Sequence, residues 1–173
     1  NYPSLIYYIN DDYQNNNILA SLFCAETELN EDVVVCYSDI IFEQEVVEKL
    51  INSSGDLNVV VDEDWKKSYV GRALHPESQA EKVVFMPDNK QNKVSQIGKH
   101  LLADISNGEF IGMFKLSQRG AHLFKSVYYD VLQKKGTGPF QHALSVKKAY
   151  VTDLFQEIVD RGFEVNCVLI KGG

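Results

Sequence analysis

Short apolar segments alternate with amphipathic helical patterns along the chain, and this alternation constrains the fold more than any other feature. Segments rich in β-branched and aromatic residues predict strands at 3–10, 33–38, 57–62, 81–98 (a hairpin of two short strands), 109–117 and 163–170. Apolar residues at helical spacing predict helices at 15–29, 43–53, 117–135 and 145–162. Uniformly apolar strands between helices are typical of a mainly parallel sheet with helices on both faces. The hairpin makes the expected sheet mixed, so we expect an α/β fold with a mixed, mainly parallel sheet.

The composition indicates one globular domain, residues 1–173, without a nucleic-acid or membrane partner. Hydrophobic residues make up 45% of the 173 positions, which is enough for an ordinary core. The formal net charge is −7, and the 17 Lys and Arg residues are dispersed among 24 Asp and Glu residues, so no basic stripe for nucleic acid is present. No apolar run approaches the roughly 18 residues that a membrane span requires.

The three cysteines indicate a reducing compartment. Cys24, Cys36 and Cys167 are far apart, have no metal-ligand spacing and lie in apolar patterns, so we expect buried thiols. The first residues have neither the basic start nor the apolar core of a signal peptide, and a cytoplasmic location is therefore expected. Because the chain begins at Asn1 without a Met, we expect it to be an internal piece of a longer chain.

Three predicted strands end on side chains that could carry chemistry, and ligands of open α/β sheets bind outside such strand ends. Asp39 follows the apolar run at 33–36, Asp62 ends the next strand, and Lys115 lies near the end of the strand at 109–117. A carboxylate, an acidic and aromatic cluster, and a lysine at one sheet edge would suit a metal ion, a cationic group and a phosphate, respectively.

Each of these residues also has a structural interpretation. Asp39 could instead cap a helix or a turn, and the acidic segment 62–65 could be a solvated loop anchored by its Trp. Lys115, by contrast, must reach solvent or an anion because it lies in an apolar strand. The chain contains no Ser-His-Asp order, zinc pattern or Rossmann glycine motif.

Six segments, in order, resemble the nucleotidyltransferases of the GT-A-like fold. They are NNNILASLFCAETEL, VVVCYSDIIFEQEVVEKL, VVVDEDW, AEKVVF, GEFIGMFKLS and AYVTDLFQEIVDRGFEVNCVLIKGG, and together they span nearly the whole chain. The resemblance is greatest to the cytidylyltransferases that activate phosphocholine or 2-aminoethylphosphonate, including those fused to phosphoenolpyruvate mutase.

This resemblance implies attack by a phosphate or phosphonate oxygen on the α-phosphorus of CTP, with loss of pyrophosphate, as a step in phosphonate or phosphocholine metabolism. Asp39 would hold Mg²⁺ against the nucleotide phosphates, as it matches the metal-binding acid of the family. Asn17, Ser21 and Ser38 are the candidate nucleotide-binding residues. The expected partners are CTP and a small acceptor, and a homodimer is a further expectation.

The resemblance also implies an acceptor site. Asp62, Asp64, Trp65 and Tyr69 offer carboxylates and aromatic faces for an alkylammonium or choline head group. Arg72 and Lys115 would receive the phosphonate or phosphate, and Lys115 would thereby act in catalysis. A neutral sugar phosphate would require hydrogen-bonding side chains instead, and an amino-phosphonate or choline-type acceptor is therefore favoured.

Two departures from the family pattern affect the triphosphate site. The glycine-rich loop expected before the first strand and the second metal-binding Asp expected after the last strand are both absent from these 173 residues, as if the fold were truncated at both ends. We therefore expect the 173 residues alone to be weakly active or inactive. The alternatives are a sugar-1-phosphate nucleotidyltransferase and a non-catalytic ligand-binding domain.

Overall fold

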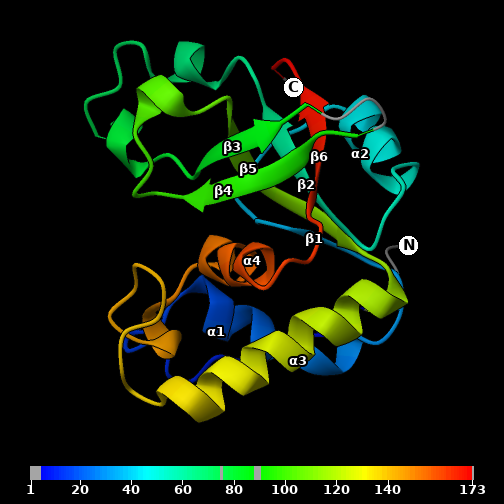
Figure 1. The fold of residues 1–173 in the computed structure, drawn as a ribbon, viewed down its shortest axis with the longest axis vertical. Coiled ribbons are helices and arrows are strands. Elements are labelled where there is room, and N and C mark those ends of the chain that lie inside the picture. The colour runs from blue at the N-terminus through cyan, green and yellow to red at the C-terminus, as the bar shows by residue number, and fades with distance from the viewer. Residues whose placement is uncertain (1–4, 75, 88–90, 173) are drawn as a thin grey trace.

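A computed structural model describes residues 5–74, 76–87 and 91–172 of the chain (Figure 1). The helices are α1 (Ile18–Phe23), α2 (Gln44–Ile51), α3 (Gln118–Lys135) and α4 (Val151–Asp160). The strands are β1 (Val33–Cys36), β2 (Leu57–Asp62), β3 (Lys82–Met86), β4 (Lys93–Gly98), β5 (Gly108–Leu116) and β6 (Asn166–Ile170). Short 3-10 turns lie at Glu26–Glu28, Trp65–Tyr69, Glu77–Gln79, Ala103–Ile105 and Val146–Lys148. Among the described residues, no helix is both long and apolar enough to cross a membrane.

The strands form a mixed sheet in the order β1-β5-β2-β6-β4-β3, and β3 also pairs with β5. The prediction of a mixed α/β sheet is confirmed, but the expectation that it is mainly parallel is wrong. Of the pairings between these strands, only β2 with β6 is parallel; β5 is antiparallel to β1, β2 and β3, and β4 is antiparallel to β3 and β6. A uniformly apolar strand indicates burial on both faces, and burial does not depend on strand direction.

Helices cover both faces of the sheet, as predicted, because successive residues of a strand point to opposite faces. On β2, Val59 and Val61 belong to the larger core cluster, to which α1, α3 and α4 contribute, whereas Val60 packs in a smaller cluster with Val46 and Leu50 of α2. Figure 1 shows α1, α3 and α4 together on one side of the sheet and α2 on the other.

Several predicted elements differ from the observed ones. Residues 5–10 form no strand, and Leu5, Ile6, Tyr7 and Ile9 are exposed; the rest of the predicted segment, residues 3 and 4, lies outside the described residues. The run at 33–36 is not a buried core strand, because β1 is a sheet edge paired with β5 alone and its residues alternate between half-buried and exposed.

The cysteines also differ in part from the prediction. Cys167 is buried in β6, but Cys24 and Cys36 are exposed. Cys24 directly follows the short helix α1, and Cys36 ends the edge strand β1. An apolar sequence neighbourhood therefore does not by itself bury a thiol.

Gly120 in the first turn of α3 lies against the main chain of the loop before β2. A Cβ at this position would lie 2.0 Å from the carbonyl oxygen of Asp56. Alanine favours helix formation over glycine by about 1 kcal/mol, but this close contact should outweigh that gain.

We expect Gly120→Ala to lower the free energy of unfolding by about 1–3 kcal/mol, measured by urea denaturation. Ser126→Ala, at an exposed position of the same helix, is the control and should leave stability within about 0.5 kcal/mol of the wild type. A Gly120→Ala variant as stable as the wild type would contradict the close packing of α3 on this loop.

Candidate functional site

The antiparallel pairings of β5 bring four chain segments to one end of the sheet. Cys36 at the end of β1 pairs with Met113, and Lys82 at the start of β3 pairs with Glu109 near the start of β5. Lys82 also pairs with Gly98, the last residue of β4. The residues just beyond these ends, Asp39, Glu81 and Lys99, therefore lie at the same end of the sheet as Glu109.

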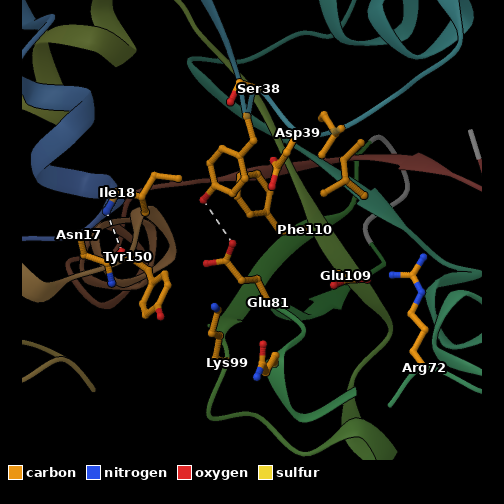
Figure 2. A pocket seen from close by; sticks show the side chains of 14 residues that line it. Asn17, Ile18, Ser38, Asp39, Arg72, Glu81, Lys99, Glu109, Phe110 and Tyr150 are labelled. Atoms are coloured by element: carbon orange, nitrogen blue, oxygen red, sulfur yellow. Dashed lines mark hydrogen bonds between the residues drawn. The ribbon is translucent and has the colours of Figure 1, made fainter. Parts of the chain in front are cut away.

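A cavity of about 680 Å³ opens at this end of the sheet. Acidic, basic and aromatic side chains share its wall, and Figure 2 shows them facing the same space. The lining residues that matter for the site are Asn17, Tyr37, Ser38, Asp39, Arg72, Glu81, Lys99, Glu109, Phe110 and Tyr150.

Asp39 lies in the turn after β1, is exposed, and lines the cavity. Helix α2 begins at Gln44 with Glu43 at its N-cap position, so Asp39 does not cap this helix. Among the described residues, no group of three or more His, Cys, Asp and Glu side chains could hold a metal ion. A single carboxylate fits Mg²⁺ only where other oxygens, such as those of a nucleotide's phosphates, complete the coordination shell.

Glu81 is a buried carboxyl held at the cavity wall by two hydroxyl groups. Tyr37 donates a hydrogen bond of 3.2 Å to Oε2, and Thr152 donates one of 2.8 Å to Oε1. The side chain is 8% exposed. Burial raises the pKa of Glu81, and the Thr152 hydrogen bond, the charge of Lys99 and the Tyr37 hydrogen bond oppose this rise only in part.

Glu109 is the second acid of the cavity wall and accepts a hydrogen bond from the Tyr69 hydroxyl. Burial also raises the pKa of Glu109, and the nearby carboxylates of Asp62 and Glu81 add to the rise. The guanidinium carbon of Arg72 lies 5.6 Å from the centroid of the Tyr69 ring. Tyr69 thus links an acid and a base of the cavity.

Lys99 is the second cation at the cavity. Its Nζ lies 4.0 Å from the centroid of the Tyr150 ring, which is within range of a cation–π contact. In the view of Figure 2, Glu81 and Glu109 lie between Lys99 and Arg72. The cavity can therefore bind both positive and negative groups of a ligand.

Among the predicted nucleotide-binding residues, Asn17 and Ser38 line the cavity, but Ser21 does not. The Asn17 side chain accepts from the Ile18 amide and donates to the Lys148 carbonyl, so it caps α1. The Ser21 hydroxyl accepts a hydrogen bond of 2.7 Å from Asn10.

The predicted acceptor cluster is only partly brought to the cavity. Arg72 lines it, and Tyr69 contacts it through Glu109. Asp62 is buried and accepts from the amides of Asp64 and Gly172, so it ties main-chain segments together. Asp64 pairs with Lys67 at 2.7 Å.

Trp65 is 1% exposed and forms part of the protein interior. A buried aromatic ring cannot stack on a ligand, so the prediction that Trp65 offers its face to an alkylammonium or choline head group is wrong. Trp65 instead anchors its loop, as the structural interpretation of the segment 62–65 predicts.

Lys115 does not reach the cavity, contrary to its predicted role. Its ammonium donates to the carbonyl oxygens of Ile51, at 2.9 Å, and of Ser53, at the C-terminal end of α2. Lys115 is half-buried, and the last carbonyls of a helix are acceptors for it because they carry partial negative charge.

The sequence interpretation missed several polar and aromatic side chains of the cavity wall: Tyr37, Glu81, Lys99, Glu109, Phe110 and Tyr150. One signal was available, since Glu81, Lys99 and Glu109 each stand at a predicted strand boundary. They come together because β3 pairs with both β4 and β5, and that pairing is not visible in the sequence.

Comparison with known proteins agrees with this architecture. No family model matches the chain. A curated relative, CTP:phosphoglutamine cytidylyltransferase of Campylobacter jejuni, is 27% identical over 176 residues, which cover 96% of this chain and 65% of the relative. The chain thus spans less than two thirds of this relative's length.

Solved structures of nucleotidyltransferases share the fold. The inositol-1-phosphate CTP transferase of T. maritima matches with a TM-score of 0.61 at 19% identity, over 92% of this chain and 54% of that one. UTP-bound UGPase of Acinetobacter baumannii matches with a TM-score of 0.56 at 14% identity, over 90% and 49%. CTP:phosphocholine cytidylyltransferase of Streptococcus pneumoniae matches with a TM-score of 0.52 at 16% identity, over 94% and 58%.

The chain therefore has the fold of the nucleotidyltransferases. The resemblance to cytidylyltransferases that its sequence indicates is confirmed by the curated relative, and the solved structures confirm the fold.

Replacing Lys115 separates its observed contacts from its predicted role. We expect Lys115→Met to lower the free energy of unfolding by about 1–2 kcal/mol, since two carbonyls lose a charged donor, and to leave acceptor affinity unchanged. Denaturation and calorimetry measure the two quantities. A variant of normal stability with weakened acceptor binding would restore the predicted phosphate-binding role.

The raised pKa of Glu81 predicts a pH-dependent effect on stability. The folded chain holds the Glu81 proton more tightly than the unfolded chain, so this stabilisation is present below the usual Glu pKa of 4.5 and is lost as the pH rises through the folded value. Glu81→Gln removes the ionisation, so it should raise Tm relative to the wild type at about pH 7.5 and less so at about pH 4. Thermal melts at both pH values test this, and Glu164→Gln, on an exposed pair with Lys93, should show no such gain.

Proposed function

We propose that the chain is the core of a nucleotidyltransferase that transfers CMP from CTP to a small acceptor bearing a phosphate or phosphonate oxygen, with release of pyrophosphate. One observation carries this proposal: in a nucleotidyltransferase fold, the carboxylate of Asp39 stands at the exit of β1 on a cavity of about 680 Å³, where it caps no helix. The choice of CTP is supported by the name of the curated relative.

In this proposal Asp39 binds Mg²⁺ together with oxygens of the triphosphate. The metal ion, when bound, neutralises charge that builds up on the phosphates as the acceptor oxygen attacks in line. Ser38, next to Asp39 on the cavity wall, is placed to donate a hydrogen bond to the nucleotide.

Lys99 and Arg72 are the cations of the cavity wall and would hold negative phosphate groups. The guanidinium can bind two oxygens of one phosphate, whereas the ammonium acts as a point charge. Positioning and charge stabilisation supply most of the rate gain in phosphoryl transfers, and the protein needs no covalent step of its own.

The acceptor is proposed to be an amino-phosphonate or a choline-type phosphate. Glu81 and Glu109 support a cationic head group better than the predicted segment at 62–65 does, since they line the cavity. Turnover measured with a panel of acceptors distinguishes this proposal from a sugar-1-phosphate nucleotidyltransferase. Calorimetry with CTP distinguishes it from a non-catalytic ligand-binding domain. We also propose that the chain acts as a single domain in the cytoplasm and assembles as a homodimer.

Asp39→Asn tests the proposed metal-binding role. We expect pyrophosphate release from CTP in the full-length protein to fall by about 100-fold or more, because the amide is a poor ligand for Mg²⁺. Asp104→Asn, in an exposed 3-10 turn outside the cavity, is the matched control and should retain full activity. Unchanged turnover in Asp39→Asn would remove this residue from the metal site.

A further inference from the structure

In the part of the chain that the structure describes, the carboxyl of Glu81 has no cation in direct contact, and the charge of Lys99 acts on it only from beyond ion-pair distance. Among the residues that the structure describes, it forms no ion pair, and its partners are the two neutral hydroxyls of Tyr37 and Thr152. The nearby cations are engaged elsewhere. Lys82 donates to the carbonyls of Ala80 and Lys99, and the Lys99 ammonium lies over the Tyr150 ring. Buried carboxylates normally contact a cation directly, so Glu81 can still accept a cationic group of a ligand.

The position of Glu81 is closely controlled. The Tyr37 ring crosses β5 at Gly112, which has φ +83°, and a Cβ at Gly112 would lie 2.3 Å from that ring. The Tyr37 amide also donates to the Gly112 carbonyl at 2.9 Å. Strand β5 thereby fixes the hydroxyl that holds one oxygen of Glu81, and helix α4 fixes the other through Thr152.

The carboxylate of Glu81 lines the cavity and can accept further hydrogen bonds there. Each carboxylate oxygen has two acceptor sites, and each accepts only one hydroxyl hydrogen bond, so acceptor capacity remains on both. Phe110 and Tyr150 line the same cavity, and the Tyr37 and Phe110 rings meet edge to face at 5.9 Å between centroids. A buried carboxyl beside aromatic rings is an arrangement that binds alkylammonium groups.

We infer that Glu81 is the specificity-determining residue that recognises a positively charged ammonium head group on the acceptor, with Glu109 as the second carboxylate of this subsite. The inference rests on the proposed function, because it assigns the recognition of the acceptor within the same cavity. It moves that recognition from the predicted segment at 62–65 to the start of β3 and the start of β5.

Phosphocholine and 3,3-dimethylbutyl phosphate test this inference, because the second compound has the same shape with an uncharged carbon in place of the nitrogen. We expect the wild type to bind phosphocholine about tenfold more tightly, measured by calorimetry. Glu81→Gln should lose this preference, and Glu109→Gln should reduce it. Glu164→Gln makes the same chemical change at an exposed pair outside the cavity and should keep the preference.

Equal affinity of the wild type for the two compounds, or a preference that survives in Glu81→Gln, would overturn the inference. The wild-type comparison needs no substitution, so it decides the point even if Glu81→Gln fails to fold. Pyrophosphate release from CTP separates the two proposals. Turnover of both acceptors at the same rate leaves the proposed function standing and overturns the inference. Tighter binding of phosphocholine that depends on Glu81, without turnover of either acceptor, supports the inference and contradicts the proposed function.

Discussion

The antiparallel pairing of β5 with β1, β2 and β3 is the constraint on which the rest of the structure depends. It places the exit of β1 beside Met113 of β5 and the start of β3 beside the first residues of β5. Without this register, Asp39, Glu81 and Glu109 would lie far apart in space. Strand β5 is antiparallel to three other strands. This explains why a sheet of apolar strands with intervening helices has so few parallel pairs here.

Burial of Glu81 shows how the cavity balances stability against binding. A carboxyl that is 8% exposed and has only neutral hydroxyl partners is costly to ionise. A well-packed apolar or amide side chain would avoid that cost, but it could not attract a cation. Residual destabilisation of this kind is common where a protein keeps a polar group ready for a ligand.

Prediction from sequence succeeded where a single strand carries the signal and failed where contacts between strands decide. The place of Asp39 just after β1 is visible in the sequence because an apolar run, an acid and a helix follow one another. Glu81 was not, since AEKVVF gives only the start of a strand, and its partners Tyr37 and Thr152 are 44 and 71 residues away. The roles predicted for Lys115 and Trp65 were wrong, because Lys115 donates to carbonyls at the end of α2 and Trp65 is buried in the protein interior.

The sequence alone determined the class of fold, the positions of most helices and strands, and the acid at the exit of β1, because periodicity and local residue order are properties of short segments. Only the tertiary structure decided the strand directions, the edge position of β1, and the set of side chains around the cavity. Those features depend on which distant segments pair, and hydrogen bonds between strands leave no mark on the residue types of either partner.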